Sequence, residues 1–137
     1  MLDCLCMDTL MAKSTKPKKV LIVEDDKAIL DILAYKISDV GFAVIQTQDG
    51  VEGLRLALAE HPDLVILDLL VPGAPGLDII DSLRKDPWGK HVPVFILTNL
   101  SAYGTIYKTL ELRAEAYFIK SDSTLESIAG EVKKRLS

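Results

Sequence analysis

The sequence predicts an α/β protein built on a doubly wound, five-stranded parallel sheet. Short apolar runs alternate with helical patterns, and five such β-α units fit between residues 18 and 136. The runs lack polar alternation, as expected of parallel strands that are covered on both faces. Right-handed crossovers leave chiefly the doubly wound arrangement, and five units are too few for an eight-stranded barrel.

The first two units each contain an apolar strand and a helix with apolar residues at helical spacing. The strands are predicted at 18–24 and 43–47. Gly41 ends the first helix, and Asp49 with Glu52 forms a capping-box arrangement that begins the second. The predicted apolar face comprises Ile29, Ile32, Leu33, Ile37 and Val40 in the first helix and Val51, Leu54, Ala57 and Leu58 in the second.

The last three units follow the same plan, with strands predicted at 64–68, 93–98 and 116–120. A loop with Pro72, Gly73, Pro75 and Gly76 leads to a helix whose apolar face carries Leu77, Ile80 and Leu83. Asp86, Pro87 and Gly89 break that helix. A less regular helix follows at about 102–112, and Ser123 with Glu126 is predicted to cap the final helix.

Composition and charge indicate one globular domain at 18–137, preceded by a flexible N-terminal extension at 1–17. The net charge of −4 does not favour nucleic-acid binding, and no apolar stretch approaches the ~20 residues of a membrane span. Cys4 and Cys6 lack the partners of a disulfide framework or a zinc site. We therefore expect a cytoplasmic protein without direct nucleic-acid or membrane partners.

Polar side chains end four of the five predicted strands. Glu24 and Asp25 follow the first, Asp68 the third, Thr98 the fourth and Lys120 the fifth. Parallel strands place these groups on one rim, where clustered carboxylates repel unless a cation intervenes. Oxygen ligands suit Mg²⁺, while a hydroxyl and an ammonium suit a phosphoryl group. This combination indicates phosphoryl transfer onto an aspartate.

The chain resembles a response-regulator receiver domain (CheY-like) of two-component signalling from about residue 18 to 136. The resemblance is carried by Leu21-Ile22-Val23-Glu24-Asp25-Asp26, by Ile66-Leu67-Asp68 with Pro72 and Gly76, by Pro93-Val94-Phe95-Ile96-Leu97-Thr98, and by Tyr117-Phe118-Ile119-Lys120. It implies the flavodoxin-like (βα)5 fold with strand order 2-1-3-4-5. It also implies a phosphoprotein of a phosphorelay rather than an enzyme, with at most self-phosphorylation and self-dephosphorylation.

The resemblance implies that Asp68 is the phosphoacceptor, supplied by a sensor histidine kinase or a histidine phosphotransfer protein. Asp25, Asp68 and the backbone carbonyl of Leu70 are then expected to bind Mg²⁺ directly, with Glu24 acting mostly through coordinated water. Asp26 is expected to serve the first helix as its N-terminal acid rather than to bind the metal.

The same resemblance assigns the readout of the phosphoryl group. Thr98 is expected to bond a phosphoryl oxygen, and Lys120 to pair with that group or with Asp68. Thr98 and Tyr117 form the switch, which reshapes the surface of helix 102–112, strand 116–120 and the final helix. A downstream protein or a second copy would dock there, and the candidate docking residues are Tyr103, Tyr107 and Leu110.

Two departures keep alternatives open. Ser121 stands where the family usually has proline, which favours a trans Lys120–Ser121 bond because a non-proline cis bond costs ~3 kcal/mol. Asn99 is larger than usual beside Thr98. The preferred hypothesis is a stand-alone receiver domain that signals through protein contacts. The alternatives are a phosphorylation-independent interaction module or a small Mg-dependent phosphatase, although no Gly-rich phosphate loop supports the latter.

Trp88 and the two histidines lie outside these motifs. Trp88 precedes the fourth strand and is predicted to cover apolar surface. His61 and His91 flank prolines in loops and have no evident partners in the sequence, so no catalytic role is expected for either.

Overall fold

Five parallel strands lie side by side in the order β2-β1-β3-β4-β5 in the computed structural model, which describes residues 16–100 and 102–137. The predicted fold class and strand order are therefore confirmed. The predicted extension at 1–17 lies almost entirely outside the described residues, as do Cys4 and Cys6. The strands are β1 (Lys19–Val23), β2 (Ala43–Thr47), β3 (Leu64–Leu67), β4 (Val94–Thr98) and β5 (Ala116–Ile119).

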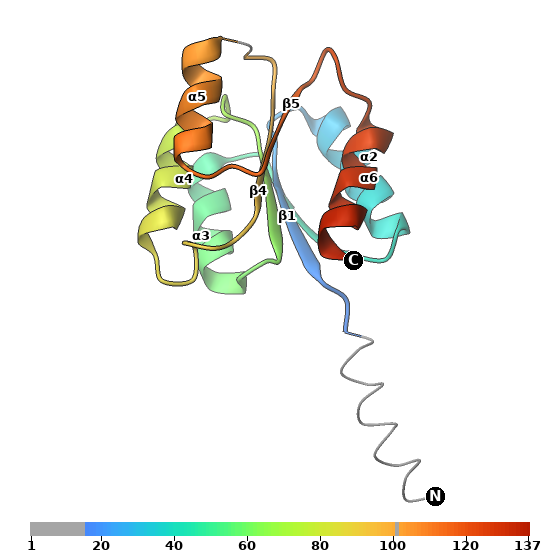
Figure 1. Cartoon of the computed structure of the whole chain (residues 1–137). Coiled ribbons are helices and arrows are strands. Elements are labelled where there is room, and N and C mark those ends of the chain that lie inside the picture. The colour runs from blue at the N-terminus through green and yellow to red at the C-terminus, as the bar shows by residue number, and fades with distance from the viewer. Residues whose placement is uncertain (1–15, 101) are drawn as a thin grey trace, which may run out of the picture.

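Helices cover both faces of the sheet, as Figure 1 shows. They are α2 (Lys27–Asp39), α3 (Gly50–Glu60), α4 (Gly76–Lys85), α5 (Tyr103–Glu111) and α6 (Leu125–Leu136). Helices α2 and α6 pack together on one face, while α3, α4 and α5 lie on the other. No helix of the described chain has the length and apolar character needed to cross a bilayer.

Each central strand contributes to two separate apolar cores because alternate side chains point to opposite faces. In β1, Val20 and Ile22 join the core under α2 and α6, whereas Leu21 and Val23 join the core under α3 and α4. All four side chains are essentially inaccessible to water. Burial on both faces explains why the strand sequences show no polar alternation.

The helices turn slightly different faces to the core than their spacing predicted. In α2 the buried residues include Leu30 and Ala34, while Ile32 is 47% exposed and Val40 is 38% exposed. In α3, Val51 and Leu58 are likewise exposed, at 58% and 39%. The predictions for these four residues were wrong because a helix with apolar residues on several sides does not reveal which side its neighbours cover.

The capping predictions were partly correct. Asp26 caps α2 by accepting hydrogen bonds from the amides of the first turn. Asp49 caps α3, but the carboxylate of Glu52 pairs with Arg55 instead of completing a capping box. The predicted cap of the last helix was wrong by one residue, since Thr124 caps α6 in place of Ser123.

Candidate functional site

The backbone hydrogen bonds of the sheet continue past the strand ends and set the positions of the polar residues. The amide of Glu24 donates to the carbonyl of Thr47 at 3.1 Å, and the amide of Asp68 donates to that of Val23 at 2.9 Å. The amide of Lys120 donates to the carbonyl of Thr98 at 2.9 Å. The carboxyl ends of the strands are therefore aligned, and their next side chains share one edge of the sheet.

Lys120 connects two buried carboxylates. Its Nζ lies 2.7 Å from Oδ2 of Asp68 and 2.9 Å from the carboxylate of Glu24. Asp68 is 3% exposed and Glu24 is 1% exposed, whereas Asp25 is exposed at the rim of the site. Oxygen atoms of all three acids lie within 4.8 Å of one another. The sequence thus correctly predicted which four charged groups meet.

The electrostatics of this group favour a further cation. Burial raises the pKa of Glu24 to about 7, although hydrogen bonds from Lys120 and the amide of Asp26 oppose the rise. Burial by itself would lower the pKa of Lys120, but Asp68 and Glu24 outweigh it and hold that pKa above its usual value. One ammonium therefore faces three carboxylates, which leaves an excess of negative charge in a poorly hydrated place.

A tight loop holds Asp68 in place. Oδ1 of Asp68 accepts a hydrogen bond from the amide of Leu70 at 3.0 Å. The amide of Gly76 donates a hydrogen bond to the carbonyl of Leu69 at 3.1 Å. A Cβ at Gly76 would lie 2.5 Å from Cα of Leu69, so only glycine permits this close approach. The contact of the Leu70 amide was not predicted, since backbone donors leave no sequence signal.

Thr98 and Tyr117 lie beside the charged group on the two last strands. The hydroxyl of Thr98 is fully buried and has no hydrogen-bond partner among the described residues, which is unusual for a buried polar group. The hydroxyl of Tyr117 donates to the backbone carbonyl of Leu100 at 2.6 Å. Burial, followed by the charge of Asp68, raises the pKa of Tyr117, so the phenol stays protonated.

The acidic residues fit a hard divalent cation. Their donor set consists of carboxylate oxygens, which Mg²⁺ prefers. Oε1 of Glu24 is buried without a hydrogen bond in the described chain, although Nζ of Lys120 lies 2.9 Å from it and donates to the other oxygen, Oε2. This orphaned acceptor is available to a water molecule in the coordination shell of a cation.

Other local predictions can be compared with the structure. There is no cis peptide bond in residues 16–100 and 102–137, so the Lys120–Ser121 bond is trans as favoured. Trp88 packs against the core below α3 and α4, which confirms its predicted role. His61, in contrast, does have a partner, because its ring stacks on Trp88 with centroids 4.5 Å apart.

A doubly wound sheet with clustered acids and a lysine at its carboxyl edge defines a class of phosphoryl-signalling domains. The family described as "Response regulator receiver domain" matches residues 20–129, and the chain belongs to this family. Receiver domains are signalling domains of two-component systems, and they typically bind Mg²⁺ through an acidic pocket of this kind.

Individual relatives agree with this assignment. The chain is 40% identical over 111 residues to "Probable transcriptional regulatory protein SilR" of Salmonella typhimurium, covering 81% of this chain and 48% of SilR. It is 38% identical over 109 residues to "Probable transcriptional regulator ycf27" of Porphyridium aerugineum, covering 80% and 44%. The phosphorylated cyanobacterial phytochrome response regulator RcpA is similar in structure, with a TM-score of 0.73, 26% identity and coverage of 87% and 91%. The chain spans about half the length of SilR and of the ycf27 regulator, the two curated relatives.

Proposed function

We propose that Asp68 accepts a phosphoryl group from a phosphohistidine of a sensor kinase or a phosphotransfer protein. The observation that carries the proposal is the placement of Asp68, whose carboxylate is nearly buried and lies 2.7 Å from Nζ of Lys120 beside two further acids. A solvent-exposed carboxylate at a strand end would be stabilised by water and would not need an ammonium beside it. The phosphorylated structure of RcpA, which this fold resembles, supports the proposal.

The transfer follows from the groups at the site. A carboxylate oxygen of Asp68 forms a bond to phosphorus as the bond between phosphorus and the donor imidazole breaks, and that electron pair stays on the imidazole nitrogen. The added phosphoryl oxygens meet the ammonium of Lys120 and the unpartnered hydroxyl of Thr98. Both groups donate hydrogen bonds that stabilise negative charge where it develops.

The carboxylates of Asp25 and Asp68 and the carbonyl of Leu70 are proposed to hold Mg²⁺. The carboxylate of Glu24 would act through a coordinated water, consistent with its orphaned Oε1. A bound cation would neutralise the excess charge of the acids and the incoming phosphoryl oxygens. Lys120, already seated between two of the acids, would keep them correctly oriented before the transfer.

The signal would leave through the face formed by α5, β5 and α6. When Thr98 turns to the phosphoryl group, Tyr117 on the neighbouring strand would respond, and its bond to the carbonyl of Leu100 couples it to the segment before α5. Tyr103, Tyr107 and Leu110 are 89%, 67% and 56% exposed on α5, and they offer an apolar surface to a downstream protein or a second copy. That the domain acts alone, without nucleic acid, stays a prediction.

Intact-mass spectrometry tests the proposal directly. The protein is incubated with Mg²⁺ and acetyl phosphate, and a single phosphate adduct is expected. Asp68→Asn should abolish the adduct, because an amide oxygen is a poor nucleophile. Asp39→Asn is the matched control, since Asp39 is an exposed acid at the end of α2, and it should leave the adduct unchanged.

Other outcomes would assign the chain differently. An adduct that persists in Asp68→Asn would place the acceptor elsewhere. The absence of any adduct and of Mg²⁺ binding would favour an interaction module that does not use phosphorylation. Repeated turnover of acetyl phosphate far beyond the protein concentration would favour a phosphatase.

A further inference from the structure

A small cleft lies at the edge of the sheet opposite Asp68. It lies between the segments that precede β4 and β5, next to the end of α4, and has a volume of about 210 Å³. Its lining consists of Arg84, Lys90, His91, Val92, Arg113 and Glu115. Three permanent cations thus share one small space in a chain whose net charge is −4.

The positive charge of this cleft is only partly neutralised within the described chain. None of the ion pairs among residues 16–100 and 102–137 includes Arg84, Lys90 or Arg113. Glu115, the one acid in the lining, is already bound to Arg135 through two hydrogen bonds of 2.5 and 3.1 Å. The charge of Glu115 still acts on Arg84 and offsets part of the positive charge, but three cations face this one shared acid.

Arg84 is the most enclosed of the three cations. Its guanidinium donates to the backbone carbonyls of Gly89, Val92, Leu112 and Arg113 at 2.8 to 3.1 Å. Burial, followed by the like charge of Arg113, lowers the pKa of Arg84 below its usual value, although the charge of Glu115 opposes this shift. The carbonyl dipoles orient the guanidinium but supply no net negative charge, so an excess of positive charge persists at the cleft.

The backbone at this edge adds an independent observation. Arg113 has a φ of 63°, and His61 has a φ of 48°, and they are the two non-glycine residues with positive φ in the described part of the chain. Both follow the end of a helix, at positions where glycine usually relieves the strain. Strained positions that keep a large side chain are found more often at functional sites than elsewhere.

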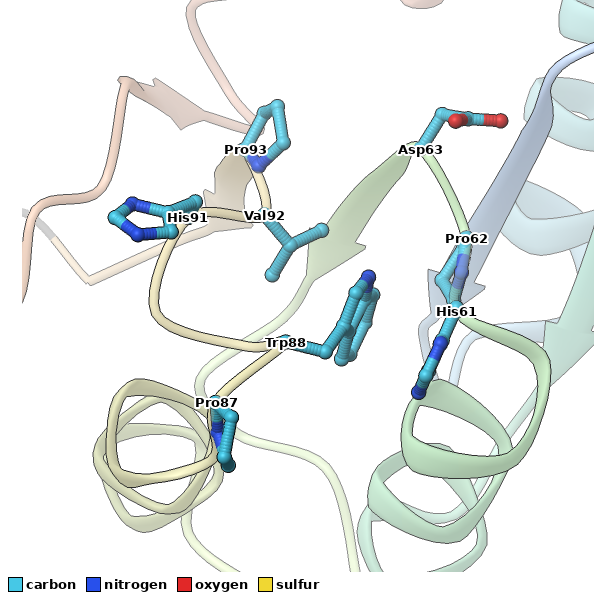
Figure 2. Close-up of a pocket in the computed structure, with 8 residues that line it drawn as sticks. All are labelled: His61, Pro62, Asp63, Pro87, Trp88, His91, Val92 and Pro93. Atoms are coloured by element: carbon cyan, nitrogen blue, oxygen red, sulfur yellow. The ribbon is translucent and has the colours of Figure 1, made fainter.

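The two strained residues line adjoining pockets. His61 and Trp88 form the wall of a larger pocket, of about 410 Å³, which shares His91 and Val92 with the cationic cleft. Figure 2 shows the stacked rings of His61 and Trp88 together and the imidazole of His91 pointing away from them. Trp88 therefore borders the cationic cleft through this shared wall without taking up its space.

We propose that the cationic cleft binds a compact phosphate-type oxyanion, with Arg113 and Lys90 as its charged ligands. Arg84 acts as a positioning residue because its hydrogen bonds hold the segment before β4 and the segment before β5 in place. A tetrahedral dianion matches the small volume and the excess positive charge, whereas an aromatic or apolar ligand would gain little from these side chains. This site is separate from the carboxyl edge and does not depend on phosphorylation of Asp68.

Trp88 is the only tryptophan of the chain and provides a built-in reporter. Sodium phosphate is titrated without Mg²⁺ into the full chain, and tryptophan emission and Tm are recorded. Sodium chloride at equal ionic strength is the reference, which separates binding from charge screening. A saturating change in emission and a higher Tm are expected with phosphate alone. Glycerol phosphate in a parallel titration shows whether the site takes free phosphate only or also an exposed monoester.

Arg113→Gly is the decisive variant because its two effects have opposite signs. Glycine relieves the left-handed strain, so the unliganded protein should have a Tm equal to or above that of the parent. Loss of the guanidinium should weaken phosphate binding about tenfold. Lys90→Gln should weaken it less, roughly threefold, since an ammonium cannot form the two parallel hydrogen bonds that a guanidinium offers an oxyanion. Lys133→Gln removes the same charge outside the cleft and should leave the affinity unchanged.

The proposal is overturned by any of three results. The first is a linear response to phosphate that chloride reproduces, which would indicate screening alone. The second is unchanged affinity in Arg113→Gly, which would place the anion elsewhere. The third is an equal loss of affinity in Lys133→Gln, which would indicate an effect of net charge rather than a site.

Discussion

The two edges of the sheet handle buried charge in opposite ways. At the carboxyl edge, Lys120 stands between Asp68 and Glu24 and forms ion pairs with both. At the amino edge, the guanidinium of Arg84 is held by neutral carbonyls and has another arginine as its neighbour. The first arrangement can be neutralised by proton uptake or by a cation, while the hydrogen bonds of Arg84 join a guanidinium to backbone carbonyls, and neither kind of group changes its charge near neutral pH. The stabilisation from the ion pairs at the carboxyl edge should therefore depend on pH, and that from the hydrogen bonds of Arg84 should not.

The largest effect is expected from Lys120→Met. Removal of the ammonium leaves two nearly buried carboxylates without their partner, which should lower the free energy of unfolding by about 3 kcal/mol. Urea unfolding without Mg²⁺ at about pH 8 measures this loss. The loss should be smaller at about pH 6, where Glu24 can take up a proton. A variant no less stable than the exposed control Lys133→Met would show that the ion pairs at the carboxyl edge do not support the fold.

Arg84→Met should have a somewhat smaller effect of a different kind. Methionine fills part of the space but leaves the carbonyls of two wall segments without their shared donor, which should cost about 2 kcal/mol. Because neither the guanidinium nor the carbonyls change charge between about pH 6 and pH 8, the loss should be nearly the same at both values. A loss that changes with pH as strongly as in Lys120→Met would remove the distinction between the two edges.

The smallest effect between about pH 6 and pH 8 is the dependence of stability on pH that comes from Glu24. Its pKa is about 7 in the folded chain against an ordinary value of 4.5, so the folded state binds this proton more tightly than the unfolded state. The stabilisation that results is complete below about pH 4.5 and is lost as the pH rises through about 7. Glu24→Gln cannot titrate and should flatten that part of the profile of Tm against pH in metal-free buffer. An unchanged profile would assign the slope to another group.

The carboxyl edge was predictable because its signals are local. A strand of four or five apolar residues followed at once by Asp68, Glu24 or Lys120 is visible in the linear sequence, and parallel pairing brings such residues together. The helix caps at Asp26 and Asp49 were predictable for the same reason, since a cap acts within three residues.

The amino edge gave no comparable signal. Arg84 lies in the last turn of an ordinary amphipathic helix, and Arg113 follows the end of another, so each has the sequence context of a surface residue. Their proximity depends on how α4 and the segment before β5 pack against the sheet, and their hydrogen bonds go to backbone carbonyls that every residue has. The exposure of Ile32 and Val51 was missed because the position of a neighbouring helix decides which apolar residue it covers.

The sequence by itself determined the α/β class, the family, and the residues that meet at the carboxyl edge. These follow from apolar runs and strand ends, where a few adjacent residues set both the local structure and the direction of the side chain. Only the tertiary structure decided the pairing of Lys120 with two acids at once, the bond from Tyr117 to the Leu100 carbonyl and the cationic cleft at the amino edge. Each of these depends on distances between segments far apart in the chain, which are set by the packing of complete helices and strands.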